Sequence, residues 1–267
     1  MKSTSFTAIV VISAAVLLHT NNSLAAVYSG NGSTTGGGAV GTGSLSLTDN
    51  GTTVSGTFNR GIGAFRLNLV IYIDCVSGGF TDTTQFSDSA DALRTAVSGY
   101  WSGGLPGPAR ATAYFANGFT ADYAIALGVN SYRGDLYHLV PGGDGSMEYI
   151  RSVNLYPNKS ETAASYTFSF NWADIGLTAG PSNFFRFQSS YIGIGGTAYR
   201  ELESFESLTG TRGYETVTFG NYNTYGIDPV PEMTTGALAI FGGIFVTARL
   251  VAHARRRRPN ANRAESK

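Results

Sequence analysis

Between residues 45 and 228, short stretches of strand-forming residues alternate with turn residues, and this alternation sets narrow limits on the fold. Residues 44–48 and 52–58 alternate apolar and hydroxyl side chains around Asn50 and Gly51. This pattern predicts a β-hairpin, because Gly51 readily takes the positive φ of a tight turn. Residues 67–76 are nearly all apolar, which predicts a strand covered on both faces. Further strands are predicted at residues 111–115, 123–127, 134–140, 148–155, 165–171, 184–194 and 215–219.

So many short strands, separated by segments rich in Gly, Pro and Asn, predict an all-β fold of the β-sandwich or jelly-roll kind. One short helix is expected at residues 88–98, where Ala92, Leu93, Ala96 and Val97 recur at helical spacing. The sequence shows no internal repeat, which disfavours a solenoid or a propeller. We therefore expect a single sandwich domain over residues 45–228.

The chain has 267 residues but only one cysteine, Cys75. Because one thiol cannot form an internal disulfide, the domain depends on the burial of apolar side chains. Cys75 follows an apolar run and is itself expected in the core. His138 is the only histidine within residues 27–228. This composition argues against Ser/His and Cys/His catalysis and against a zinc site.

The charges are unevenly distributed along the chain. Residues 27–228 hold 16 acidic and 10 basic residues, a net charge of −6. Residues 249–267 hold seven basic residues and one glutamate, a net charge of +6. An acidic domain repels the phosphate backbone, so we expect no nucleic-acid partner for the main domain.

The N-terminus has the three parts of a secretory signal peptide. Lys2 precedes an apolar stretch at residues 8–18, and small residues follow, with cleavage expected after Ala25 or Ala26. The alternative, a retained anchor, is disfavoured because about 11 apolar residues are too few to span a bilayer. We assign residues 1–26 to the signal peptide and residues 27–44, rich in Gly, Ser and Thr, to a flexible segment.

The C-terminus has the features of a membrane anchor. Residues 236–248 carry no charge, and a helix over residues 235–254 would be about 30 Å long, enough to cross a bilayer with Arg249 reaching the headgroups. Four arginines, 255–258, would remain cytoplasmic as a topology stop, followed by a disordered cytoplasmic end at residues 259–267. The alternative is a buried core helix with a basic tail that binds nucleic acid. It is disfavoured because this helix has no polar face.

Val230, Pro231 and Glu232, followed by a short Gly-rich membrane helix and Arg255, Arg256, Arg257 and Arg258, resemble the sorting tail of PEP-CTERM proteins. The resemblance covers residues 229–258, and Met233 stands where that family usually has a second proline. It implies signal peptidase and an exosortase-type processing enzyme as partners. It also implies transit through the inner membrane as a single-pass protein, and then residence at the cell surface or in the extracellular matrix of a biofilm.

Glu201, Glu203 and Glu206 lie close together in the sequence. On a strand, Glu201 and Glu203 would share a face about 7 Å apart, within the range of a glycosidase pair. Neighbouring acids on one face are more often a solvated sheet edge, and catalytic pairs usually come from different strands. We therefore favour the solvated edge and assign no catalytic residue.

Four aspartates, Asp82, Asp88, Asp91 and Asp144, could supply oxygen ligands to a structural calcium ion. No spacing here matches an EF-hand, so the ligands stay unassigned, and no cofactor is expected. Asp88 has an alternative role as the cap of the helix that it precedes.

Aromatic residues are dense, and most are expected in the core of a domain without disulfides. The body loosely resembles jelly-roll carbohydrate-binding modules, which implies that exposed aromatic rings could stack on sugars. Trp101, surrounded by Gly and Pro, is the aromatic residue least typical of a core and the possible glycan contact.

Together these features predict an exported, non-enzymatic β-sandwich with a structural or adhesive role at the surface or in the matrix. The alternative is an exopolysaccharide-binding module on the same membrane-sorted carrier. A third option, a secreted polysaccharide-cleaving enzyme, is disfavoured by the lack of convergent acids and histidines.

Overall fold

The computed structural model describes residues 25–103, 109–129, 133–155, 160–178, 180, 183–195, 198–213 and 216–226. The chain divides into two units, Met1–Gly226 and Ile227–Lys267, and the second lies outside the described residues. Residues 1–24 of the predicted signal peptide, the Val230-Pro231-Glu232 motif, the predicted helix at 235–254 and Arg255 to Arg258 also lie outside them. No helix within the described ranges has the length and apolarity needed to cross a membrane.

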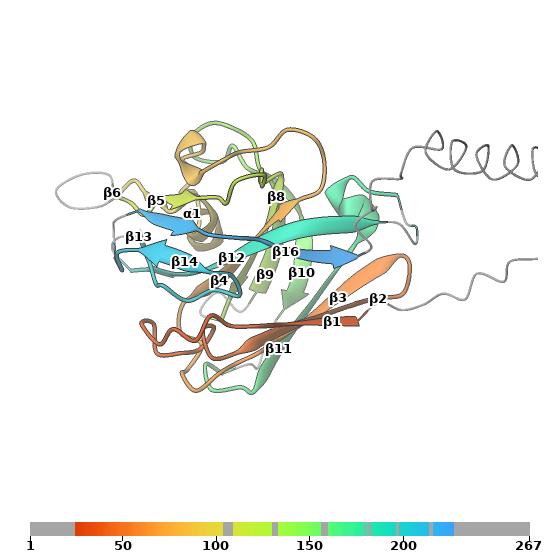
Figure 1. Ribbon diagram of the computed structural model, residues 1–267. Helices are drawn as coiled ribbons and strands as arrows, with labels where there is room; N and C mark the ends of the chain where they lie inside the picture. Colours follow the sequence, from red (N-terminus) through yellow and green to blue (C-terminus); the bar gives the residue numbers. More distant parts are fainter. Residues whose placement is uncertain are drawn as a thin grey trace, which may run out of the picture. The chain divides into compact units, whose positions relative to one another are not determined.

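The domain is mostly β-structure, as the sequence predicts, and two antiparallel sheets form its main body (Figure 1). The first sheet has the order β1 (Ala25–Ser29), β2 (Ser44–Asp49), β3 (Thr53–Asn59) and β11 (Ser165–Asn171). The second has the order β10 (Glu148–Leu155), β9 (Arg133–His138), β8 (Tyr123–Gly128), β4 (Asn68–Asp74), β12 (Phe184–Ile194) and β13 (Ala198–Arg200), with β16 (Asn223–Gly226) also paired to β12.

A third layer covers the other face of the second sheet. It contains α1 (Ala92–Ser98), the 3₁₀ turn η1 (Thr83–Gln85), the pair β5 (Tyr100–Trp101) and β6 (Ala109–Arg110), and a small sheet of β14 (Leu208–Gly210), β15 (Val217–Phe219) and β7 (Ala113–Tyr114). A further 3₁₀ turn, η2 (Trp172–Ile175), follows β11. The second sheet is therefore the central layer of the domain.

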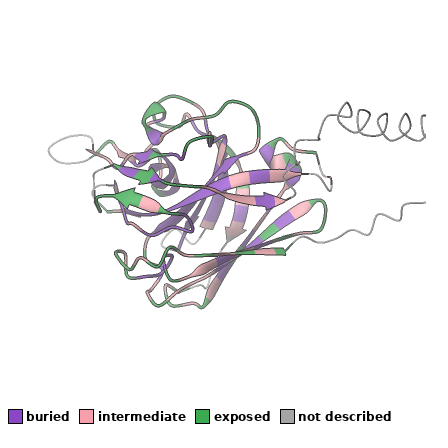
Figure 2. Cartoon of the chain, in the orientation of Figure 1, coloured by how far each residue is buried: buried purple, intermediate pink, exposed green. Residues whose placement is uncertain are grey.

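Strand β4 shows why two separate cores form. Leu69, Ile71 and Ile73 point into the first core, between the two sheets, whereas Val70 and Tyr72 point into the second core, under α1. All seven residues of the strand are buried (Figure 2). Side chains alternate across a strand, so a nearly continuous apolar run contributes to both cores at once. The prediction that this strand is covered on both faces is confirmed.

The predicted hairpin is also confirmed. Strands β2 and β3 pair antiparallel, and Gly51 at the turn has a φ of 88°. The Asp49 carboxylate accepts from the Gly51 N–H, and the Asn50 side chain accepts from the N–H groups of Thr52 and Thr53. These local bonds fix the register of the hairpin.

The helix is shorter than predicted, Ala92–Ser98 instead of 88–98. Its N-cap is Asp91, whose carboxylate accepts from the N–H groups of Leu93 and Arg94. It ends at Gly99, which has a φ of 66°. The alternative role suggested for Asp88 as the cap is therefore wrong, because Asp88 is buried three residues before the capping position.

The segment 27–44, predicted to be flexible, requires a correction. Residues 25–29 form β1 against β2, and Ala39 and Val40 are fully buried in the first core. The physical reason is a buried carboxylate, Glu203, which binds four backbone N–H groups of this segment. Cleavage is predicted after Ala25 or Ala26. These two residues lie at the start of β1, opposite Thr48 and Leu47.

Candidate functional site

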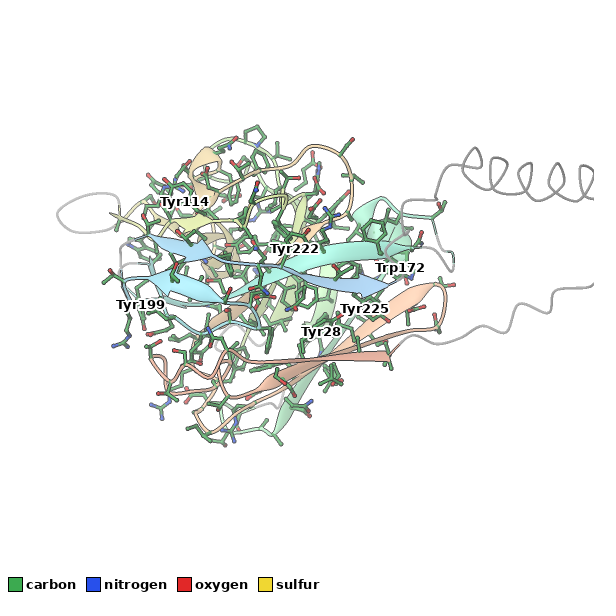
Figure 3. All side chains as sticks on the ribbon, viewed as in Figure 1. Tyr28, Tyr114, Trp172, Tyr199, Tyr222 and Tyr225 are labelled. Carbon is green, nitrogen blue, oxygen red and sulfur yellow. The ribbon has the colours of Figure 1, made fainter. Side chains whose placement is uncertain are left out.

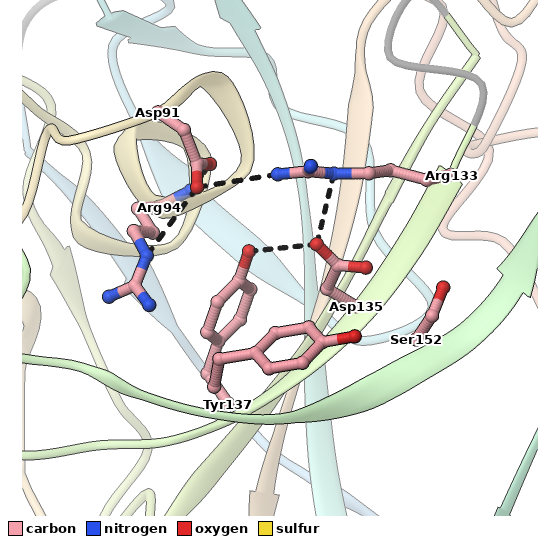
Figure 4. A pocket seen from close by; sticks show the side chains of 7 residues that line it. Asp91, Arg94, Arg133, Asp135, Tyr137 and Ser152 are labelled. Carbon is pink, nitrogen blue, oxygen red and sulfur yellow. Dashed lines mark hydrogen bonds and ion pairs between the residues drawn. The ribbon is translucent and has the colours of Figure 1, made fainter.

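A small pocket lies between the N-terminal end of α1 and the edge of the second sheet formed by β9 and β10 (Figure 4). Its volume is about 290 Å³. Charged and phenolic side chains dominate its lining, which consists of Asp91, Arg94, Arg133, Asp135, Tyr137, Tyr149 and Ser152.

The local structure explains why these side chains meet. Arg133, Asp135 and Tyr137 alternate along β9 and therefore project from one face of the sheet. Tyr149 and Ser152, three residues apart on β10, would point to opposite faces of a regular strand. The register of β10 shifts between Tyr149 and Arg151, so that Tyr149 lies opposite Tyr137 and Ser152 lies opposite Asp135. Such bulges re-aim side chains at sheet edges.

A chain of ion pairs crosses the pocket. From α1, Asp91 contacts Arg94 at 3.4 Å and Arg133 at 3.3 Å. The Arg133 Nε lies 3.0 Å from the Asp135 carboxylate, which also accepts a hydrogen bond from the Tyr137 hydroxyl at 3.1 Å (Figure 4). At the far end Arg94 contacts the buried carboxylate of Asp88 at 2.6 Å. The network thus links the start of α1 to the face of β9.

Exposure divides this network into a buried base and an accessible rim. Asp135 is only 3% exposed, whereas the side chains of Asp91 and Arg133 are 35% and 40% exposed. Burial raises the pKa of Asp135, and the neighbouring Arg133 partly offsets that rise. The pKa of Tyr137 is also raised, first by burial and then by the carboxylates of Asp91 and Asp135. Tyr137 therefore stays a phenol that donates to Asp135.

Two features leave the pocket able to take a ligand. The Arg133 Nε is buried and close to Asp135, but no hydrogen-bond acceptor in the described part of the chain is aligned with its N–H. Tyr149 is 54% exposed and meets the ring of Tyr137 edge to face, with centroids 6.2 Å apart. An open aromatic ring beside paired donors and acceptors can hold a small polar molecule that has one apolar face.

The three clustered glutamates do not form a solvated edge, so that interpretation is wrong. All three side chains are buried, and each binds a different part of the domain. Glu201 forms a two-point ion pair with Arg212. Glu203 accepts from the backbone N–H groups of Gly36 and Gly38, both at 2.7 Å, and also from those of Val40 and Gly41.

The third glutamate, Glu206, accepts from the backbone N–H and the hydroxyl of Ser189, both at 2.8 Å, and from the Asn223 amide at 2.9 Å. Burial raises its pKa to about 8, so the side chain is mostly a neutral acid at pH 7. Donors within the protein thus occupy all three glutamates, which hold the N-terminal segment, β12, β16 and the 208–213 region together.

Glu206 also borders a second, wider and more open hollow of about 800 Å³. Leu202, Phe205 and Leu208 supply its apolar part. Its other lining residues are small and uncharged, namely Asn31, Gly32, Ser33, Ser207 and Asn221.

The four aspartates considered for calcium each accept hydrogen bonds from donors of the protein. Asp82 accepts from the N–H of Thr84, and Asp144 accepts from the N–H and hydroxyl of Ser89. The pKa of Asp88 is lowered: burial alone would raise it, but hydrogen bonds from Gly145, Ala90, Arg94 and Met147 outweigh that effect. Within the described ranges, no three Asp, Glu, His or Cys side chains come together in a way that could hold a metal ion.

The remaining residues singled out from the sequence lie elsewhere. Trp101, the possible glycan contact, is half-buried in β5 and packs against the second core, and its buried indole N–H has no hydrogen-bond partner among the described residues. Cys75 is half-buried, and its thiol donates to the Ile175 carbonyl; burial, followed by the charges of Asp122 and Asp74, raises its pKa. His138 lies 2.9 Å from the carboxylate of Glu148.

Sequence analysis missed the pocket at α1 and β9. A signal was present, because Asp135 and Tyr137 alternate within the strand predicted at residues 134–140, with Arg133 directly before it, and charged residues on a covered sheet face need partners. The contributions of Asp91 and Tyr149 could not be read from the sequence. Comparison of this chain with protein-family models, curated proteins and solved structures finds no match.

Proposed function

We propose that this chain is an exported, non-enzymatic protein of the cell surface or extracellular matrix, where its sandwich acts as a structural or adhesive component that holds carbohydrate. The predicted signal peptide and the PEP-CTERM-like tail support the route. In this proposal Pro231 and Glu232 are read by an exosortase-type enzyme, and Arg255 to Arg258 set the topology in the inner membrane.

The observation that carries the carbohydrate-binding part is the pocket at α1, β9 and β10. It combines the exposed ring of Tyr149 with the accessible ion pair of Asp91 and Arg133. Sugars present hydroxyls that both donate and accept, together with C–H faces that pack on aromatic rings. A carboxylate and a guanidinium group held in fixed positions can bind a pair of hydroxyls, because the first accepts and the second donates hydrogen bonds.

The three clustered glutamates support a role other than glycoside hydrolysis. A glycosidase needs one carboxyl group that gives up its proton and one free carboxylate. Here Glu201 and Glu203 are held by Arg212 and by the backbone of residues 36–41, and Glu206 by Ser189 and Asn223.

The binding proposal is tested by incubating the purified full-length chain in detergent with extracellular polysaccharide of the source organism. We expect the protein to co-sediment with the polysaccharide and to release no new reducing ends. Release of reducing ends would overturn the non-enzymatic assignment, and failure to co-sediment would overturn the assignment of this ligand.

The sorting proposal is tested separately, by fractionating cells that express either the full chain or a chain without residues 233–267. We expect the full chain to be found at the surface or in the matrix in a shortened form, and the truncated chain to be missorted. Identical location and size of the two proteins would show that the tail is not a sorting signal.

A further inference from the structure

We infer that the pocket formed by α1, β9 and β10 takes a single uncharged sugar residue, which Asp91 and Arg133 bind through neighbouring hydroxyls while Tyr149 packs on the ring. This inference rests on the proposed carbohydrate-binding function and specifies the ligand class of that site.

The size of the pocket supports a single residue. At about 290 Å³ it lies near the lower end of the range of about 300–1,000 Å³ that small-molecule sites span. The ion pair between Asp91, at the N-terminus of α1, and Arg133, on β9, crosses this space. One pyranose ring fits such a space, whereas a long stretch of polysaccharide would have to lie outside it.

The charges of the pocket support an uncharged ligand. Each guanidinium group already has carboxylate neighbours: Arg94 has Asp88 and Asp91, and Arg133 has Asp91 and Asp135. In the lining, the carboxylates of Asp91 and Asp135 balance the guanidinium groups of Arg94 and Arg133, so a charged ligand would meet no uncompensated charge of opposite sign. Like charges at close range cost free energy, so a uronate is disfavoured.

The accessible atoms support hydroxyl recognition. Asp91 Oδ2 and an Arg133 terminal nitrogen lie 3.3 Å apart, and both side chains are partly exposed. One hydroxyl of a sugar can donate to this carboxylate while its neighbour accepts from the guanidinium. A partly exposed ion pair is worth only about 0–1 kcal/mol, so the two side chains can separate slightly to admit the ligand.

The buried groups beneath this pair act as positioning residues. Asp135, held by the Tyr137 hydroxyl, fixes the stem end of the Arg133 guanidinium. Among the described residues only the ion pair with Asp135 holds the buried Arg133 Nε, and no acceptor is aligned with its N–H, so a small rotation of the guanidinium toward a ligand breaks no hydrogen bond of that atom.

The test measures the full-length chain in detergent by affinity electrophoresis, in gels cast with single polysaccharides. The neutral panel contains α- and β-linked glucans, mannans and galactans; the charged panel contains alginate, polygalacturonate and chitosan. We expect retardation by at least one neutral polymer and by no charged one. That retardation should be relieved by the methyl glycoside of the same sugar and unchanged by added salt.

Three variants locate the site. Tyr149→Ala and Asp91→Asn should each weaken retardation by about tenfold or more, equivalent to about 1.4 kcal/mol. Tyr114→Ala is the matched control, because Tyr114 is a similarly exposed tyrosine (44%) on β7 and does not line the pocket (Figure 3). Unchanged thermal unfolding of Tyr149→Ala, and no more than the loss of about 0.5 kcal/mol expected for Asp91→Asn at the cap of α1, show that any loss of binding is local.

The outcomes separate this inference from the proposed function. Retardation by a charged polymer that Tyr149→Ala abolishes would overturn the uncharged ligand but keep the pocket as a carbohydrate site. Retardation that Tyr149→Ala and Asp91→Asn leave intact would overturn the pocket as the site. No retardation by any polymer would overturn carbohydrate binding itself.

Discussion

Two charged clusters in this domain have opposite characters. The glutamates at positions 201, 203 and 206 are at most 2% exposed, and Glu203 and Glu206 bind mainly backbone and neutral side-chain donors. The cluster at α1 and β9 pairs carboxylates with guanidinium groups and keeps Asp91 and Arg133 open to solvent. The first cluster stabilises the fold, whereas the second can exchange partners with a ligand. Exposure and the kind of partner separate the two clusters.

The largest effect is expected from Glu203, which forms no ion pair with any described residue and accepts from four backbone N–H groups. Glu203→Gln should lower the free energy of unfolding by about 3–4 kcal/mol, because an amide cannot accept all four bonds and places its own NH₂ against backbone N–H groups. Urea denaturation measures this loss. Glu161→Gln, at an exposed glutamate paired with Arg66, is the control and should change stability by less than about 0.5 kcal/mol.

Glu206 predicts a pH dependence of stability. Its folded pKa is raised from 4.5 to about 8, so the folded protein holds a proton that the unfolded chain releases. The contribution is therefore fully present below pH 4.5 and declines as the pH rises to about 8. The slope should be about 1 kcal/mol per pH unit.

The variant Glu206→Gln should remove this slope in urea denaturation series at several pH values. Equal slopes for the variant and the parent chain would show that Glu206 is ionised in the folded protein. Glu206 would then be a charged carboxylate, like those of the pocket, and the two clusters would not differ in this respect.

In the pocket, Tyr149→Ala should reduce glycan binding by about 1.4 kcal/mol, or tenfold, and change the unfolding free energy by less than about 0.5 kcal/mol. Glu203→Gln should have the reverse profile, with a large loss of stability and no direct loss of binding. Isothermal titration with the methyl glycoside identified by electrophoresis measures the first effect. A large loss of stability in Tyr149→Ala would show that this ring is part of the structure rather than of a site.

The smallest effects are expected from Asp91, which caps α1 and also forms the ion pair with Arg133 in the pocket. Asp91→Ala should cost about 1 kcal/mol of stability through loss of the helix cap, whereas Asp91→Asn keeps a capping oxygen and should cost about half of that. Both variants remove the charge that faces Arg133, so both should weaken binding. Binding that survives in Asp91→Asn would limit the role of Asp91 to the helix.

Much of the strand pattern could be predicted from local sequence. The predicted strands at 148–155, 165–171 and 184–194 have the observed bounds of β10, β11 and β12, because alternation and apolar runs depend only on which faces are covered. Strands β1, β5, β6, β13, β14 and β16 were not predicted. They have two to five residues each, too few for a pattern to stand out.

The sequence by itself determined the all-β character, the hairpin at Gly51 and the doubly covered strand β4, because these follow from turn conformation and side-chain alternation. Only the tertiary structure decided the roles of the charged residues. Glu203 meets residues 36–41 across more than 160 positions, and a register shift between Tyr149 and Arg151 places Tyr149 opposite Tyr137 and Ser152 opposite Asp135. The reason is physical: a charge acts through burial and through the partners around it, and both are set by segments that are far apart along the chain.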